Sequence, residues 1–375
     1  MKHFILNLSI EQQITFVVLF VSLLIQTLYY LLVYLRPFFW KRKTTNNKEN
    51  KISVIICAKN EYENLKNNLP RILTQKYSDY EVIVVNDCST DDSEMLLGEM
   101  KQQYKHLRHT TIEPDIKFSH GKKLAITIGI KSAKYEHLVF IDADCYPTSN
   151  QWLNEINKSY TTNKQIVLGY GGYEHKKGFL NKLIRFDTLF IAMQYFGFAT
   201  IGNPYMGVGR NLSYIKRLFL KGKGFSKHYQ MLSGDDDLFV NDNANKKNTA
   251  LVLSKNSFTL SKPQESWKNW IKQKKRHLTT GKFYKKKDKF FLGLELLTRF
   301  LFYSSLLYLI YLNTNIIITI SVYSFRLILQ IIIIKLNMIK MKEKGFLLLI
   351  PLFDMLLPII YFLFLFSNKK KYIVK

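Results

Sequence analysis

The chain has 375 residues, and its 55 Lys and Arg residues outnumber its 28 Asp and Glu residues by 27. An excess of this size indicates a polyanionic partner, either nucleic acid or the anionic face of a membrane. Three cysteines, Cys57, Cys88 and Cys145, are too few and too odd in number for a disulfide framework. They exclude a disulfide-stapled domain and predict free thiols in a reducing compartment.

The first apolar run favours the membrane over nucleic acid. Residues 14–35 carry no charge over about 22 positions, which at about 1.5 Å per residue is enough to cross a bilayer. A belt of aromatic residues between Tyr29 and Trp40 follows, and then the basic stretch 41–43. These flanks predict a retained anchor and place the following residues in the cytoplasm. We therefore predict that residues 1–50 form an N-terminal transmembrane anchor with a basic linker.

Residues 51–265 are predicted to form one α/β domain with a mainly parallel sheet. Three apolar, β-branched runs, ending near residues 58, 85 and 141, are each followed by a loop, and the first two lead into clear helical patterns. Ligands of such sheets bind beyond the carboxyl ends of the strands. Four acidic residues fall at this edge: Glu61, Asp87, Asp142 and Asp144.

Asp142 and Asp144 follow the third strand directly and lie one residue apart. Because residues i and i+2 of a strand point to the same face, both carboxylates are aimed into the same space. Their mutual repulsion and their hard oxygen atoms favour a divalent cation, Mg²⁺ or Mn²⁺. Taken alone, the pair is more typical of an Asp-rich turn that closes a buried strand, so the neighbouring segments must decide.

Two polar segments follow the third strand. Residues 231–245 contain Asp235, Asp236 and Asp237 before a helix-like stretch, an arrangement that helix N-termini also favour. The segment 266–289 places tryptophans against lysines, and this pattern predicts an amphipathic helix on anionic lipid headgroups.

Residues 290–375 are predicted to form a C-terminal transmembrane region of two to three helices. The apolar stretches lie at about 290–312, 315–334 and 345–366. Charged residues within them are expected to face protein or a polar cavity: Glu295, Arg299, Arg326 and Asp354. Three crossings would put the basic tail outside, so either the last stretch re-enters or the first lies along the surface. A further apolar stretch, residues 183–202, carries Arg185 and Asp187 and predicts a helix in the core or at the membrane surface.

Four motifs in this order resemble the nucleotide-sugar-binding half of the family 2 glycosyltransferases. They are SVIICAKNEYENL, VIVVNDCSTDDS, GKKLAITIGI and VFIDADCYPT, and the resemblance extends over most of residues 51–280. It implies a GT-A-like, Rossmann-type mixed sheet, between one N-terminal and two to three C-terminal transmembrane helices.

The resemblance implies a role for each matching residue. Ala58 and Glu61 would line the nucleoside pocket, Asp87 would contact the base, usually uracil, and Lys122 or Lys123 would approach the donor. Asp142 would serve the ribose or sugar and, with Asp144, the metal ion on the diphosphate, Mg²⁺ or Mn²⁺.

The family's catalytic base precedes a leucine by three residues, and Leu238 therefore indicates Asp235. Gly234 stands where the family usually has Glu, which leaves Asp236 as an alternative. In QKKRH, Gln273 and Arg276 match the Q-x-x-R-W motif. Arg276 could pair with the diphosphate, while His277 replaces the Trp on which an acceptor sugar would stack.

The segment NPYMGVGRNLSY resembles the family's acceptor loop. Gly209 would allow close approach of the backbone, and Arg210 and Asn211 would either hold substrate hydroxyls or only order the loop.

The function predicted from these residues is transfer of a sugar, with inversion and with a divalent metal, from a UDP-sugar to a lipid-linked, glycan or other cell-envelope acceptor. The enzyme would be a multi-pass cell-membrane protein with a cytoplasmic catalytic domain, bound to membrane lipids and not to nucleic acid. One alternative is a processive polysaccharide synthase, although His277 and the few apolar segments argue against long chains. The other is a non-catalytic protein that binds a membrane surface.

Overall fold

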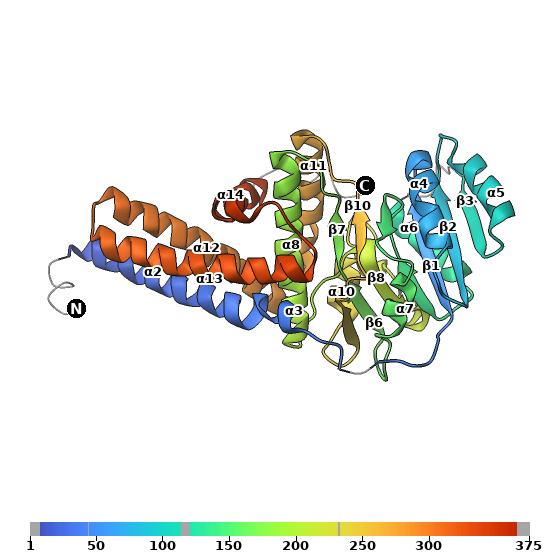
Figure 1. Cartoon of the computed structure of the whole chain (residues 1–375), viewed down its shortest axis with the longest axis horizontal. Coiled ribbons are helices and arrows are strands. Elements are labelled where there is room, and N and C mark those ends of the chain that lie inside the picture. Colours follow the sequence, from blue (N-terminus) through green and yellow to red (C-terminus); the bar gives the residue numbers. More distant parts are fainter. Residues whose placement is uncertain (1–7, 44, 114–120, 232, 366–375) are drawn as a thin grey trace.

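The computed structural model describes residues 8–43, 45–113, 121–231 and 233–365. The molecule is elongated, with three long helices at one end and the α/β part at the other (Figure 1). Helix α8 (Phe179–Thr200) lies between the two parts.

The main sheet has seven strands in the order β3-β2-β1-β4-β8-β6-β9. Their bounds are β1 Ile52–Ala58, β2 Tyr80–Asp87, β3 Leu107–Ile112, β4 His137–Phe140, β6 Ile166–Gly169, β8 Leu212–Ile215 and β9 Thr249–Val252. The first four in spatial order are parallel, β8 is antiparallel to both of its neighbours, and β9 is parallel to β6. The prediction of a mixed, mainly parallel sheet is confirmed.

A second, three-stranded sheet lies at the carboxyl edge of the first. It consists of β5 (Cys145–Pro147), β10 (Thr259–Ser261) and β7 (Gly171–Tyr173), in that order. Because β5 begins directly after Asp144, this sheet fixes the backbone that carries the two carboxylates of the fourth motif, Asp142 and Asp144.

Helices cover both faces of the main sheet, as the alternation of side chains along a strand requires. On one face, Val54 and Ile56 pack with α4 (Tyr62–Leu73), α5 (Ser93–Gln103) and α7 (Trp152–Asn157). On the other face, Ile55 packs with α6 (Lys122–Ser132) and α8. The remaining helical elements of this part are η2 Gly209–Asn211, α9 Lys216–Lys221, η3 Ser226–His228, α10 Asp237–Asn243, α11 Trp267–Leu278 and η4 Thr280–Phe283.

Four helical stretches among the described residues are long and apolar enough to cross a membrane: Ile10–Phe39, Lys286–Tyr311, Ile316–Lys340 and Leu347–Phe364. The first is built from α2 (Ile10–Tyr29), a π-helical turn η1 (Tyr30–Tyr34) and α3 (Arg36–Phe39). The second is α12 (Lys286–Tyr311) and the third is α13 (Ile316–Lys340). The fourth consists of η5 (Leu347–Leu349) and α14 (Ile350–Leu365). In Figure 1, α2, α12 and α13 lie along one another, whereas α14 is seen nearly end-on and crosses them.

The four charged residues predicted to avoid lipid are buried, each with at most 3% of its surface exposed: Glu295, Arg299, Arg326 and Asp354. Arg326 Nη2 lies 2.8 Å from Asp354 Oδ2, and Arg299 Nη1 lies 3.4 Å from Asp354 Oδ1. Arg299 Nε also donates to Glu295 Oε1 at 3.1 Å. Pairing offsets the large cost of burying these charges and ties α12, α13 and α14 together.

Helix α8 is a core helix, one of the two alternatives for the apolar stretch 183–202. Most of its length is buried between the sheets and the long helices. A Cβ added at Gly197 would come within 2.5 Å of the carbonyl oxygen of Val33, so only glycine lets α8 approach η1 this closely.

Candidate active site

The acidic residues predicted at strand ends lie together at the carboxyl edge of the main sheet. Strand β1 ends at Ala58 and β2 at Asp87, and β4 ends two residues before Asp142. Residues Ile52 to Ala58 pair in register with Tyr80 to Asn86, so the ends of the two strands are level. Glu61 follows in the loop that enters α4.

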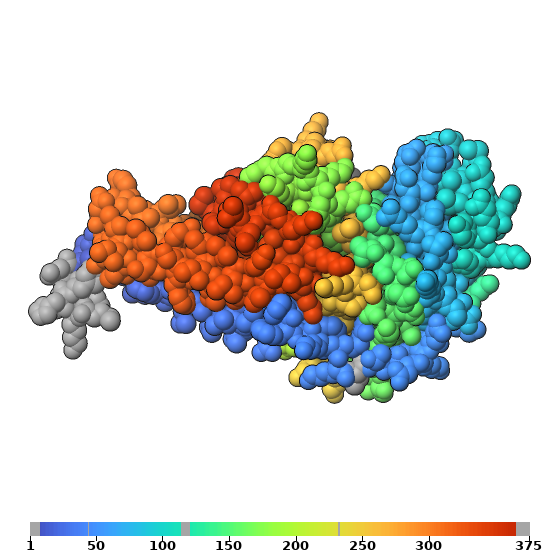
Figure 2. All heavy atoms as spheres, in the orientation of Figure 1, coloured from blue at the N-terminus to red at the C-terminus, as the bar shows by residue number. Residues whose placement is uncertain are grey.

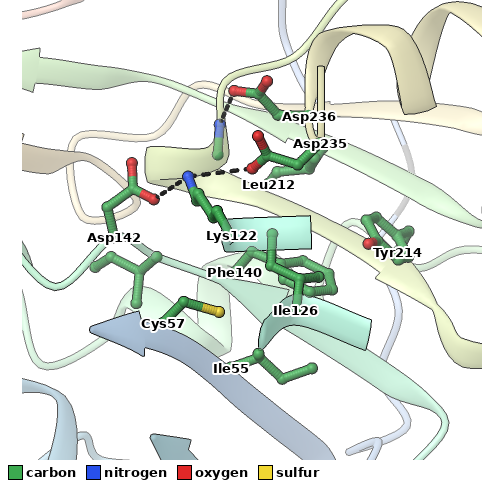
Figure 3. Close-up of a pocket in the computed structure, with 12 residues that line it drawn as sticks. Ile55, Cys57, Lys122, Ile126, Phe140, Asp142, Leu212, Tyr214, Asp235 and Asp236 are labelled. Atoms are coloured by element: carbon green, nitrogen blue, oxygen red, sulfur yellow. Dashed lines mark hydrogen bonds and ion pairs between the residues drawn. The ribbon is translucent and has the colours of Figure 1, made fainter. Parts of the chain in front are cut away.

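A pocket opens beside these strand ends, between β1, β4, β8, α6 and the start of α10 (Figure 3). Its floor is apolar and includes Ile55, Ile126 and Phe140. Its polar wall contains Lys122 and three carboxylates: Asp142, Asp235 and Asp236. Residues 93 positions apart in sequence, Asp142 and Asp235, thus face the same space.

Lys122 bridges the two carboxylates. Its Nζ lies 2.7 Å from Asp142 Oδ1 and 3.1 Å from Asp235 Oδ2 (Figure 3). Burial lowers the pKa of Lys122, but the two carboxylates outweigh it and raise the pKa well above its usual value. Burial likewise raises the pKa of Asp142, but Lys122, with smaller contributions from Arg210 and Arg276, lowers it below its usual value. The bridge is therefore an ion pair at neutral pH.

Of the two lysines left open by the sequence, only Lys122 lines this pocket. The Lys123 ammonium donates to the backbone carbonyls of His228 and of Met231, the latter at 2.7 Å, and only 5% of the residue is exposed. Burial lowers the pKa of Lys123 to about 8. Lys123 therefore holds the segment before α10. Of the two lysines predicted to approach the donor, Lys122 is the one whose position fits this role.

Asp144 has no ion-pair partner among the described residues, although the charges of Arg210 and Lys122 act on it. The ligand atoms of Asp142, Asp144 and Cys145 lie within 4.8 Å of one another. Burial and then the charge of Asp142 raise the pKa of Asp144, and burial raises the pKa of the Cys145 thiol, which therefore stays protonated. The two carboxylates offer the hard oxygen atoms that Mg²⁺ and Mn²⁺ prefer, so this corner of the pocket fits a divalent metal.

The three consecutive aspartates have different surroundings. Asp236 accepts hydrogen bonds from Gly209 N at 2.6 Å and from Asp237 N at 2.8 Å, and it caps α10. Asp237 accepts from Tyr284 OH at 2.6 Å and from Thr280 Oγ1 at 2.5 Å, away from the pocket. Asp235 has Lys122 as its one charged partner in the described structure. Its carboxylate is therefore the one that faces the pocket without a structural bond to the backbone.

Asp236 also has an unusual pKa. Burial, followed by the charges of Asp235 and Asp237, raises the pKa of Asp236 to about 7. A value near neutrality suits a catalytic base, but both oxygens of Asp236 already accept backbone N–H groups. These hydrogen bonds therefore favour a structural role, in which Asp236 holds the Gly209 loop in place.

The predicted nucleoside pocket is lined by the ends of β1 and β2. Asp87 is 5% exposed, and its Oδ1 has no hydrogen-bond partner among the residues described. A buried acceptor of this kind suits a ligand N–H donor. The two loops are tied together by hydrogen bonds from Asn60 N to Ser89 Oγ at 2.8 Å and from Tyr62 N to Asp91 Oδ2 at 3.0 Å.

Arg210 and Asn211, predicted together as acceptor-loop residues, separate in the structure. The Arg210 guanidinium lies 4.4 Å from the centre of the Tyr173 ring and contributes to the positive potential at Asp142. Asn211 is 1% exposed and donates to Tyr170 O at 2.9 Å and Ser257 O at 2.7 Å, while its Oδ1 accepts from Trp152 Nε1 at 3.1 Å. Of the two roles predicted for Asn211, these contacts favour the second, in which the side chain only orders the loop.

We expect Asn211→Ala to lower the free energy of unfolding by about 3 kcal/mol, because it leaves buried groups without partners. The change should appear as a lower thermal unfolding midpoint in detergent. Asn67→Ala is the matched control, since Asn67 is an exposed residue of α4 whose side chain contacts only Glu63 O at 2.6 Å. An unchanged midpoint for Asn211→Ala would remove the structural role.

Helix α11 carries the predicted Q-x-x-R-W variant. It begins at Trp267, where Ser266 Oγ accepts a hydrogen bond from Asn269 N, and it buries Trp270, whereas Arg276 and His277 are exposed. Because Thr280, just after α11, donates to Asp237 Oδ2, the end of this helix lies close to the aspartates of the pocket wall, and the charge of Arg276 helps to lower the pKa of Asp142. The helix packs on protein along one side, so the amphipathic pattern predicted to contact lipid serves in part to dock α11 on α14 and, through Lys274 and Asp187, on α8.

Several residues of the site were missed by sequence reasoning. Tyr173 lies under Arg210, and Tyr284 and Thr280 orient Asp237. No local pattern identifies these partners, since they come from distant segments. Asp187 offered a signal, because a carboxylate inside an apolar stretch needs a partner.

The fold is GT-A-like, and carboxylates from distant segments face one another at the carboxyl edge of its sheet. Residues 53–219 match the family model described as Glycosyl transferase family 2. This chain therefore contains a family 2 glycosyltransferase domain, as the four motifs predict.

The curated relatives are named as synthases of a polysaccharide, poly-beta-1,6-N-acetyl-D-glucosamine. A poly-beta-1,6-N-acetyl-D-glucosamine synthase of Staphylococcus epidermidis is 28% identical over 123 residues, which are 32% of this chain and 29% of that protein. Its Staphylococcus aureus counterpart is 31% identical over 93 residues, or 25% and 21% of the two chains. The match thus spans less than a third of either relative.

A solved structure supports the fold over most of the chain. It is a mannosyltransferase from Pyrobaculum calidifontis in complex with GDP-Man and Mn²⁺. The similarity covers 88% of this chain and 98% of that one, with a TM-score of 0.59 and 15% identity. At this identity the similarity establishes the fold alone.

Proposed function

We propose that this protein is a membrane-anchored, metal-dependent, inverting glycosyltransferase that moves a sugar from a UDP-sugar to a lipid-linked or cell-envelope acceptor. The observation that carries the proposal is that carboxylates face one another at the pocket, with Asp142 and Asp144 on one side and Asp235 on the other. The Lys122 ammonium lies between them, 2.7 Å from Asp142 Oδ1 and 3.1 Å from Asp235 Oδ2. One side suits a donor diphosphate with its cation, and the other suits a base.

The donor would bind along the carboxyl edge of the sheet. Asp87 Oδ1, buried and without a partner in the described structure, would accept the imide N–H of uracil. Ala58 and Glu61 would flank the nucleoside, and Asp142 would contact the ribose or sugar. Lys122, Arg210 and Arg276 surround Asp142 with positive charge, which would stabilise the diphosphate.

Asp235 would act as the general base. The acceptor hydroxyl oxygen attacks the anomeric carbon from the side opposite UDP, the bond from that carbon to the diphosphate oxygen breaks, and the hydroxyl proton passes to Asp235. Lys122 Nζ, 3.1 Å from Asp235 Oδ2, holds this carboxylate in place before the acceptor arrives. Asp236 positions the Gly209 backbone beside the reacting groups.

Asp142 and Asp144 would hold the divalent cation. When bound there, Mg²⁺ or Mn²⁺ supplies positive charge to the departing diphosphate. The similar fold solved with a nucleotide sugar and Mn²⁺ supports this assignment but does not choose between the two metals.

The arrangement of the long helices supports a cytoplasmic catalytic domain. Lys340 Nζ donates to Trp40 O at 3.0 Å, so the basic stretches 41–43 and 335–344 lie at the same, domain-facing end. The positive-inside rule places this end in the cytoplasm. Because α14 crosses the other helices at that end (Figure 1), the alternative in which the last stretch does not cross the bilayer fits better.

A processive polysaccharide synthase is the second candidate, favoured by the names of the curated relatives. The two candidates share the donor site and differ in product length. Sizing of the product by mass spectrometry separates them, since a ladder of long chains supports the synthase and one or a few added sugars support the first proposal.

The direct test is UDP release by the purified, detergent-solubilised protein over a panel of UDP-sugars, with and without Mn²⁺ or Mg²⁺, and with membrane lipid as acceptor. We expect turnover of one UDP-sugar that requires the metal. No turnover and no calorimetric UDP binding would overturn the proposal. Loss of all function on charge reversal at residues 285–287, with the acids dispensable, would instead support a non-catalytic membrane-surface protein.

A further inference from the structure

A buried ion pair holds helix α11 on the side that packs against the protein. The Lys274 ammonium pairs with Asp187 of α8, whose side chain is 0% exposed. The same carboxylate accepts a hydrogen bond from Tyr361 OH of α14. Three helices, α8, α11 and α14, therefore meet at one carboxylate, and the red α14 adjoins the green α8 in Figure 2.

This pair fixes which face of α11 points outward. Trp270 and Lys274, four residues apart, lie on the face that packs on the protein. Gln273 and Arg276, three residues apart, share another face. Neither of these two side chains has a hydrogen-bond or ion-pair partner within the described residues, and the charge of Arg276 acts on Asp142.

Helix α14 connects the same carboxylate to the long helices. Asp354, held by Arg326 at 2.8 Å and by Arg299 at 3.4 Å, lies seven residues before Tyr361 and thus two turns away on the same side of α14. An isolated buried carboxylate is costly, and removing one partner of such a pair leaves the other charge uncompensated. The connection from the long helices to α11 is therefore resistant to rearrangement.

We propose that Asp187 is a positioning residue for the transfer reaction: through Lys274 it fixes the rotation of α11, so that Arg276 faces the pocket, and through Tyr361 it ties that rotation to α14. The inference rests on the proposed function, because Arg276 is taken to contact the donor diphosphate. Asp187 itself touches neither donor nor acceptor in this assignment.

The test compares full-length variants in detergent by UDP release. Asp187→Asn and Lys274→Met are each expected to lower kcat/KM by about tenfold to a hundredfold, since small misplacement of a binding group has effects of this size. In an Arg276→Ala background, Asp187→Asn is expected to change kcat/KM less than twofold, because its effect passes through Arg276. Lys274→Arg, which keeps the charge, should retain most of the activity.

Hydrogen–deuterium exchange of residues 267–278 gives a readout that does not depend on turnover. Asp187→Asn should speed exchange in this segment while leaving β1 and β2 protected. If that variant fails to fold, Tyr361→Phe, which removes one hydrogen bond and keeps the ion pair, should show a smaller loss that is also absent in the Arg276→Ala background.

Wild-type kinetics in Asp187→Asn, losses that multiply with that of Arg276→Ala, or unchanged exchange in α11 would each overturn the inference. An unmodified chain that releases no UDP would count against the proposed function instead, and exchange would still test whether Asp187 positions α11.

Discussion

Replacing Asp235 by Asn is expected to lower kcat by about 10²–10⁴-fold, the contribution typical of a general base, with the Kd for the UDP-sugar nearly unchanged. The physical reason is the separation of roles in the pocket. In the proposed assignment Asp235 faces the acceptor and Asp142 and Asp144 serve the donor, and Asp235 accepts no backbone hydrogen bond among the described residues. Lys122 can still pair with Asp142 at 2.7 Å in this variant.

The measurements are steady-state UDP release and calorimetric binding of the UDP-sugar. Asp242→Asn, in the helix α10 that begins two residues after Asp235, is the matched control, since Asp242 pairs with His228 at 3.3 Å rather than with Lys122. Asp236→Asn should also lose activity, but with a lower unfolding midpoint, because Asp236 holds the Gly209 loop. An active Asp235→Asn beside a well-folded, inactive Asp236→Asn would transfer the role of base to Asp236.

Replacing Asp144 by Asn is expected to remove metal-stimulated turnover, with a loss of about a thousandfold. Stabilisation of the leaving diphosphate by a bound cation is worth several kcal/mol, and each 1.36 kcal/mol is about tenfold in rate. Asp144 should show the effect cleanly because, unlike Asp142, it has no lysine or arginine ion-pair partner within the described structure.

The experiment titrates Mn²⁺ and Mg²⁺ against UDP release and follows Mn²⁺ binding by electron paramagnetic resonance in the presence of UDP. Asp79→Asn is the control, as Asp79 is an exposed residue whose side chain lies 3.3 Å from Lys51. If Asp144→Asn keeps metal-dependent turnover and the Mn²⁺ signal of the unmodified enzyme, the metal binds elsewhere and the assignment of this corner is wrong.

Much of the fold could be predicted because its signals are local. Strands β1, β2 and β4 appear as short apolar runs, and the acids that follow them mark the carboxyl edge of the sheet. The helices α12, α13 and α14 appear as long apolar stretches, and the burial of Arg326 and Asp354 follows from the cost of charge in lipid. Strand β8, which reverses the sheet, has no such signal, since its direction depends on its neighbours.

The sequence by itself determined the class of domain, the apolar helices and the edge at which the acidic residues gather, because strand and helix periodicity and the cost of buried charge act on neighbouring residues. Only the tertiary structure shows that Lys122 rather than Lys123 lines the pocket, that Asp236 rather than Asp235 accepts backbone hydrogen bonds among the described residues, and that the Asn211 side chain is buried. Adjacent residues on a helix or loop point in different directions, and which one faces the pocket depends on how the element is rotated in its packing. The pairing of Asp187 with Lys274 likewise exists only because α8 and α11 pack together.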